Sequence, residues 1–213
     1  MSREYPGIFL TFEGIDGAGK SKQISLLCTA LEHNGYNVRV TREPGGDSVG
    51  EGVRNLLLHQ RMCSKAELLL FLASRAQNTE SVIVPALKDG YIVLCDRYID
   101  SSVAYQGYAR GLPPEEVIRL NRFATDDLIP DLTFLLDISP ALGLARQKDG
   151  NRMEAEGVEF MQRAREGFLA IAAAGPGRVI LLDASLTSDV LHTAILHHVY
   201  GLLQDHTHQQ QES

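Results

Sequence analysis

A glycine-rich segment that follows a short apolar run constrains the fold of this chain more than any other feature. The segment GIDGAGKS matches the pattern G-x-x-x-x-G-K-[ST] directly after the run IFLTF and one glutamate. Glycines let successive backbone N–H groups turn inward around phosphate oxygens, where a Cβ atom would clash. The lysine can reach the outer phosphates of a nucleotide, and the final serine hydroxyl can bind Mg²⁺. The expected nucleotide-binding residues are Gly14, Ile15, Asp16, Gly17, Ala18, Gly19, Lys20 and Ser21.

A glycine-rich turn without a ligand is the alternative interpretation of this segment. The apolar run before it is typical of a central strand, and the residues after it have the spacing of an amphipathic helix from about Lys20 to His33. A strand, a loop and a helix in this order place the positive end of the helix dipole at the loop. We therefore expect a phosphate-binding loop.

Apolar runs alternate with helical patterns along the rest of the chain. Strands are expected at residues 8–13, 38–41, 92–96, 132–137 and 179–183. The alternation indicates an α/β fold with a parallel sheet, whose ligand site lies at the carboxyl ends of the strands. Gly14–Ser21, Arg42–Asp47 and Asp96–Gly107 should therefore meet at one edge. No linker interrupts the pattern, so one domain is expected over residues 1–213, with a disordered tail at about 206–213.

Three local patterns refine this prediction. Ser64 and Glu67 have the spacing of a capping box, which predicts a helix start. Phe71 and Arg75 stand four residues apart on that helix and share a face. The segment from Arg97 to Gly111 mixes small polar, aromatic and cationic residues, which is not a core pattern.

Charge and cysteine usage exclude several classes of protein. The net charge of −7 argues against a general nucleic-acid or membrane-surface binder, so a polyanion needs a local cationic cluster. No apolar run approaches the length of a membrane span, and the start MSREYPG lacks an export signal. Cys28, Cys63 and Cys95 have no metal-type spacing, and each lies in or beside an apolar segment. Reduced, mostly buried thiols and a cytoplasmic location are therefore expected.

A phosphate loop alone does not name a reaction, because GTPases, ATP-driven motors and kinases all use one. The chain has no [NT]-K-x-D segment to read guanine, which argues against a GTPase. The strand at residues 92–96 ends in Asp96-Arg97, without a second acid to activate water, which argues against a hydrolytic ATPase. These two absences weaken two of the classes and do not by themselves name the reaction.

The succession FEGIDGAGKS, TREPGG, GEGVR, LASRAQ and DRYIDSSVAYQGYAR resembles the signatures of the bacterial thymidylate kinases, in that family's order and spacing. The similarity continues through NRMEAEGVEF and LLDAS, so it covers nearly the whole chain. The resemblance implies Mg²⁺- and ATP-dependent phosphorylation of dTMP to dTDP for dTTP synthesis. It also implies a P-loop kinase fold with a five-stranded parallel sheet, helices on both faces, a short mobile lid at about 146–157, and a homodimer.

The resemblance assigns a role to each candidate site residue. It implies that Lys20, Arg97 and an arginine of the lid act in catalysis, and that Ser21 and, through water, Asp96 hold Mg²⁺. The implied dTMP-binding residues are Asp16 on the 3′-hydroxyl, Arg54 and Arg97 on the phosphate, Phe71 and Arg75 on the base, Ser102 and Gln106 at the base edge, and Tyr105 against the sugar. Without the resemblance, core packing for Phe71 and solvated charges for Arg54 and Arg75 stay open.

The chain departs from the family pattern at Lys22, at Asn78 and in its short lid, which carries Arg146, Lys148 and Arg152 instead of the denser arginine runs of some members. Lys22 replaces a small hydroxyl residue, and Asn78 stands where histidine is common. Gly17 leaves no arginine inside the phosphate loop, so the transition-state arginine should come from the lid. We expect Arg152 in this role, with Arg146 as second candidate. The rival functions are a kinase for another nucleotide or deoxynucleoside on the same fold, and an ATP-binding regulator without a phosphoryl acceptor.

Overall fold

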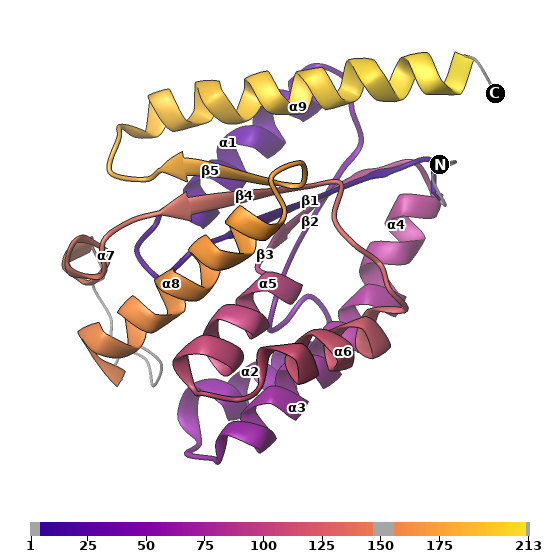
Figure 1. The fold of residues 1–213 in the computed structure, drawn as a ribbon. Helices are drawn as coiled ribbons and strands as arrows, with labels where there is room; N and C mark the ends of the chain where they lie inside the picture. Colours follow the sequence, from indigo (N-terminus) through magenta and orange to yellow (C-terminus); the bar gives the residue numbers. More distant parts are fainter. Residues whose placement is uncertain (1–4, 147–155, 212–213) are drawn as a thin grey trace.

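The computed structural model describes residues 5–146 and 156–211 (Figure 1). Along the chain, the elements of this part are β1 Ile8–Glu13, α1 Lys20–His33, β2 Val38–Arg42, α2 Ser48–His59, α3 Ser64–Asn78, the π-helical η1 Thr79–Ile83, α4 Val84–Lys88, β3 Ile92–Asp96, α5 Ile99–Ser102, the π-helical η2 Val103–Ala109, α6 Pro114–Thr125, β4 Leu132–Asp137, α7 Pro140–Arg146, α8 Val158–Ala174, β5 Val179–Asp183 and α9 Ser188–Gln211. The lid expected at about 146–157 lies, except for its ends, outside the described residues.

The strands of the described part form one five-stranded sheet with the order β2-β3-β1-β4-β5, and every neighbouring pair is parallel. The predicted α/β class and sheet are thereby confirmed. All six residues of β1 are buried, as expected for the central strand, since both of its faces are covered. The phosphate loop directly follows this strand.

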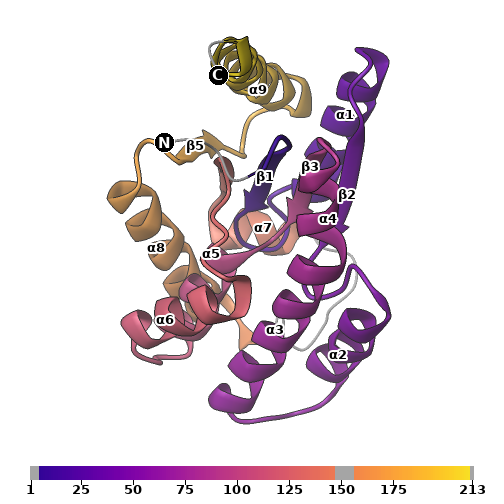
Figure 2. The same cartoon turned by 90° about the vertical axis from the view of Figure 1, so that its right-hand side faces the viewer.

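Helices cover both faces of the sheet (Figures 1 and 2). On one face, α1 and α9 pack Leu27, Leu31, Ile195 and Val199 against β1, β3 and β4. On the other face, α8 and η2 pack against the sheet, with Phe160 and Phe168 around Tyr105. This second layer carries the pocket described below.

The segment after β3 is the main departure from the sequence-based prediction. Ser101–Gly107 is buried throughout, and Tyr98 is 0% exposed. The expectation that this segment lies outside the core is wrong. Its polar side chains can be buried because they form hydrogen bonds within the segment and with acids on distant elements.

Two smaller expectations also differ from the structure. Helix α3 does begin at Ser64, but Cys63 is its N-cap, no side chain caps it, and Glu67 is buried in contact with η2. The tail was expected to fray from about residue 206, whereas α9 continues to Gln211 and His206 is 9% exposed. Each turn added to an existing helix costs little because nucleation is already complete.

The cysteines are free thiols, but they are not all buried. Cys95 lies in the core, Cys28 is half-buried, and Cys63 is exposed at the N-cap of α3, where the expectation of burial is wrong. Among the described residues, no helix combines the length and the apolar character that crossing a membrane requires.

Candidate functional site

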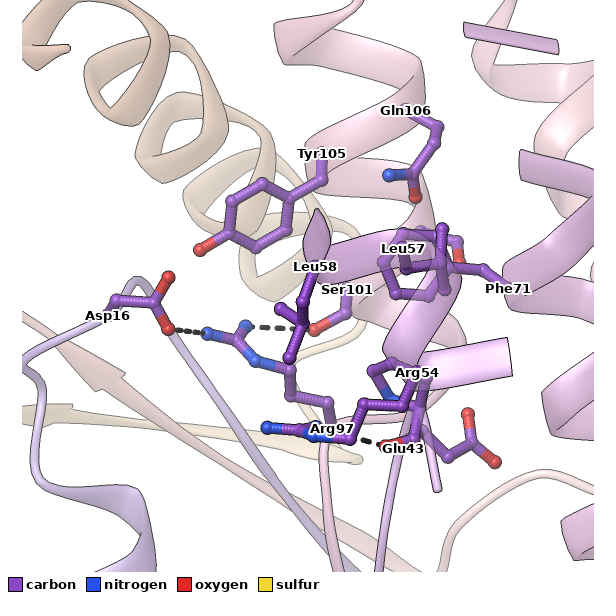
Figure 3. A pocket seen from close by; sticks show the side chains of 12 residues that line it. Asp16, Glu43, Arg54, Leu57, Leu58, Phe71, Arg97, Ser101, Tyr105 and Gln106 are labelled. Atoms are coloured by element: carbon purple, nitrogen blue, oxygen red, sulfur yellow. Dashed lines mark hydrogen bonds and ion pairs between the residues drawn. The ribbon is translucent and has the colours of Figure 1, made fainter. Parts of the chain in front are cut away.

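Three loops meet at the carboxyl edge of the sheet, where the sequence places them. Two adjoining cavities lie there, and both are lined by Asp16, Glu43, Arg54 and Arg97. One cavity, of about 310 Å³, extends along the loop from Gly17 to Lys22. The other continues toward aromatic and amide side chains from α3 and η2 (Figure 3). The edge thus joins a polar cavity along the phosphate loop to one of mixed polar and apolar lining.

The phosphate loop depends on glycine at the positions the pattern requires. Gly14, Gly17 and Gly19 have φ values of 131°, 82° and 90°. A Cβ on Gly14 or Gly17 would collide with the carbonyl oxygen of Leu136 or Gly143. Only glycine therefore permits this close approach of loop and neighbouring backbone.

Lys20 turns back into the loop that it follows. Its ammonium donates to the carbonyls of Gly14 at 3.0 Å and Ile15 at 3.2 Å, and the residue is 7% exposed. Burial, reinforced by Arg97, lowers the pKa of Lys20. The charge is held at the start of α1, where an incoming anion would also meet the helix dipole.

The structure brings Ser21 and Asp96 together from α1 and β3. The Ser21 hydroxyl donates to Oδ2 of Asp96 at 2.8 Å. A hydroxyl and a carboxylate at the edge of a phosphate cavity form an oxygen donor set of the kind that Mg²⁺ prefers. These two residues fit the metal role expected of them.

Arg97 occupies the centre of the site in a strained backbone conformation. Its φ of 70° is in the left-handed region, which costs a residue with a side chain about 1–3 kcal/mol. The guanidinium donates to Asp16 at 2.5 Å, to the Gly14 carbonyl at 3.0 Å and to Ser101 at 3.2 Å. Burial opposes ionisation of Asp16, but Arg97, Lys20 and Arg54 outweigh it and lower the pKa of that carboxyl.

Glu13 supports the turn that carries Arg97 and was not identified from the sequence. Its carboxylate accepts from the Tyr98 backbone N–H at 2.7 Å and from the Ser101 hydroxyl at 2.5 Å. Burial and the Asp100 carboxylate raise the pKa of Glu13 to about 7. The available signal was an acid at the end of a wholly buried strand, one residue before the phosphate loop.

The second cavity collects the side chains expected to hold a pyrimidine nucleotide. Phe71 of α3, and Ser102, Tyr105 and Gln106 of the segment after β3, all line it. Figure 3 shows Phe71, Tyr105 and Gln106 in this wall. Arg54 also lines it and donates to the Pro44 carbonyl at 3.0 Å, so Arg54 is not a solvated charge. The buried Tyr105 hydroxyl has no hydrogen-bond partner within the described part of the chain. An unpartnered hydroxyl in a pocket wall is suited to a polar ligand group.

Arg75 lies behind this wall and is not part of its lining. It is 1% exposed, so the interpretation as a solvated charge is wrong. Its guanidinium donates to Glu43 at 2.6 Å, to Ser102 at 2.7 Å and to the Tyr98 carbonyl at 2.8 Å, and it also bonds to Asn121. Its expected contact with a base stays a prediction, and Arg75→Ala would leave Glu43 buried without its cation.

The structure shows hydrogen-bond partners for Asn78, which departs from the family pattern. It accepts from the Thr41 hydroxyl at 2.7 Å and donates to Glu43 at 3.2 Å, so with Arg75 it fixes the acid of the second loop. Burial raises the pKa of Glu43 despite these partners. Lys22 is exposed at the margin of the phosphate cavity.

Of the two lid arginines considered for catalysis, Arg146 lies in the described part of the chain. Arg146, at the end of α7, is exposed and donates to the Ala184 carbonyl at 2.9 Å. Arg152 lies outside the described residues.

A parallel sheet with a phosphate loop, an adjacent hydroxyl–carboxylate pair and arginines leading to a second pocket defines a P-loop kinase for a small phosphorylated acceptor. Comparison with known proteins narrows this class. The family model "Thymidylate kinase" matches residues 12–195. The chain belongs to the thymidylate kinase family.

Individual members of the family are similar in sequence to this chain over most of their length. The thymidylate kinase of Solidesulfovibrio magneticus is 47% identical over 88% of this chain and 96% of that protein. The thymidylate kinase of a Synechococcus strain is 48% identical over 83% of this chain and 87% of that protein. A crystal structure of thymidylate kinase from Ehrlichia chaffeensis superposes with a TM-score of 0.76 at 37% identity, covering 91% of this chain and 98% of the other.

Proposed function

We propose that this protein transfers the γ-phosphoryl group of ATP to dTMP, giving dTDP and ADP, with Mg²⁺ as cofactor. The observation that carries the proposal is the pair of cavities that share Arg54, Arg97 and Asp16. A donor triphosphate on the loop and a monophosphate in the second cavity would meet at these arginines.

The chemistry of the acceptor explains why cations dominate this edge. The second pKa of a phosphate monoester is about 6, so the acceptor is mostly ionised at neutral pH and needs no strong general base. The barrier comes from bringing two polyanions into line, through a transition state with charge on equatorial oxygens. Lys20, Arg54 and Arg97 supply fixed positive charge there. Mg²⁺, held by Ser21 and through water by Asp96, would neutralise the remaining phosphate charge.

The acceptor side of the proposal assigns side chains to each part of dTMP. Arg54 and Arg97 hold the phosphate, and Asp16 accepts from the 3′-hydroxyl. Phe71 stacks on the base, while Tyr105 packs on the sugar where a ribonucleotide carries an extra hydroxyl. Ser102 and Gln106 stand at the base edge. The lining of one cavity by all these side chains supports this assignment.

Substrate selectivity tests the proposal. With ATP and Mg²⁺, we expect dTMP to be used modestly better than dUMP, which lacks only a methyl group, and about 5- to 150-fold better than dCMP, the cost of one mispaired buried polar group. Steady-state ADP formation with a panel of monophosphates measures this. Equal use of dCMP or dGMP would overturn the thymidylate assignment and leave a kinase for another nucleotide. ATP turnover independent of any monophosphate would indicate the regulator instead.

We propose further that the chain acts as a homodimer in the cytoplasm, where free thiols are maintained. An exposed apolar groove runs between α3 and α6, where Leu69 is 59% and Phe123 is 85% exposed. Contiguous exposed apolar side chains of this kind are typical of interfaces, and the same groove on a second copy could pair with it about a twofold axis.

The dimer is tested at the most exposed of these side chains. Phe123→Glu places a charge in the groove and should shift the mass measured by light scattering from dimer to monomer. Val190→Glu is the matched control, because Val190 is 52% exposed on α9, away from the groove. A monomeric wild-type protein, or an unchanged dimer in the Phe123 variant, would contradict this surface.

A further inference from the structure

A buried acid lies behind the amide of the base pocket. Glu67, in the first turn of α3, is 1% exposed. Its Oε1 accepts from Nε2 of Gln106 at 3.0 Å and from Nε of Arg110 at 3.1 Å, and its Oε2 accepts from Nη2 of Arg110 at 3.2 Å. The two-point pairing with Arg110 compensates the charge that this carboxylate brings into the protein.

This contact determines which end of the Gln106 amide faces the carboxylate. A glutamine carries a donor NH₂ and an acceptor carbonyl of nearly the same shape. An ionised carboxylate only accepts hydrogen bonds, so it selects the NH₂ group. The carbonyl oxygen is then the amide atom left for the pocket, and in Figure 3 it points in the direction of Phe71.

Arg110 is itself held in place, which makes the arrangement rigid. Its guanidinium lies 4.5 Å from the centre of the Phe160 ring, and its Nη1 is 2.6 Å from the carboxylate of Glu156. These contacts hold the guanidinium in place as the partner of Glu67.

We propose that Glu67 is a specificity-determining positioning residue: by holding the NH₂ of Gln106, it presents an acceptor oxygen to the base. Thymine and uracil carry an N–H donor at N3, which matches that oxygen. Cytosine has an acceptor nitrogen without a hydrogen at N3. That nitrogen and the Gln106 carbonyl oxygen would then be two acceptors facing each other, with no hydrogen bond between them. The inference rests on the proposed function, since it concerns the base of the acceptor nucleotide.

The test is Glu67→Gln, which keeps the shape but offers both a donor and an acceptor to Gln106. The Gln106 amide can then turn over, and the dTMP-to-dCMP ratio of kcat/KM should fall about tenfold, the worth of one mispaired group. The dTMP-to-dUMP ratio should stay unchanged, because both bases carry N3–H. Glu156→Gln is the matched control: it also removes a carboxylate from Arg110, yet no contact joins Glu156 to Gln106 in the described part, so both ratios should stay as in the wild type.

A second variant addresses the case in which Glu67→Gln does not fold. Gln106→Leu leaves the Glu67–Arg110 pair intact and should lower the dTMP-to-dCMP ratio by a similar factor, and adding Glu67→Gln to it should cause no further fall. An unchanged ratio in Gln106→Leu, or in folded Glu67→Gln, would overturn the inference. Equal losses for all three substrates in Glu67→Gln would overturn it too, since a purely structural acid would act in that way. Absence of discrimination in the wild-type protein is a different result, which rejects the proposed function.

Discussion

Lys20→Ala is expected to reduce phosphoryl transfer by at least about 10²–10³-fold, the cost of removing one preorganised electrostatic group, while leaving the fold intact. The ammonium is buried in the loop and bonded to the Gly14 and Ile15 carbonyls. In the free protein these carbonyls hold the cation, and with ATP bound the same charge would neutralise the outer phosphates. Alanine supplies no replacement for it. Initial rates with saturating ATP, Mg²⁺ and dTMP, together with circular dichroism, measure the two parts of this expectation.

Lys22→Ala is the matched control for that variant. Lys22 carries the same charge two residues further on and lines the same cavity, but it is exposed. Its removal should change the rate only a few-fold, because a solvated charge contributes little. Near-normal turnover of folded Lys20→Ala would show that the loop works without its lysine, and a similar loss in both variants would point to general charge, not to the position of Lys20.

The elements that the sequence predicts well are those whose signal is local. The strands at Ile8–Glu13 and Ile92–Asp96 and the helix at Lys20–His33 have the predicted bounds. A central parallel strand must be apolar on both faces, and a phosphate loop must have glycine at set positions. Both features therefore produce a recognisable sequence pattern within a few residues.

What the sequence does not predict depends on partners far along the chain. Glu13 meets Ser101, Glu67 meets Gln106, and Arg75 meets Glu43 and Asn121. Taken one at a time, the charged members of these pairs look like surface residues, since charged side chains are rarely buried unless they are paired. The burial of Tyr98 and Ser101–Gly107 was missed for the same reason, because polar side chains there bond to groups on other elements.

A second large effect on the rate of phosphoryl transfer is expected from the arginine whose charge stabilises the transition state. Gly17 contributes no side chain, and in the described part of the chain the arginines that line the phosphate cavity, Arg42, Arg54 and Arg97, already bond to the protein. In the free protein Arg97 is neutralised by Asp16, and Arg146 is tied to the Ala184 carbonyl. By this elimination, and from its place in the segment NRMEAEG, Arg152 is our candidate for the arginine that reaches the transferring phosphoryl group.

Arg152→Ala should therefore lower kcat by about 10³–10⁵-fold, the effect of an arginine finger, with little change in the KM for dTMP. An interaction made only in the transition state lowers kcat and kcat/KM equally, whereas a ground-state contact raises KM. Arg146→Ala is the matched control, because it removes the same charge six residues earlier and should cost much less. A mainly raised KM in Arg152→Ala would place that residue in substrate binding, and a larger loss of kcat in Arg146→Ala would transfer the catalytic role to Arg146.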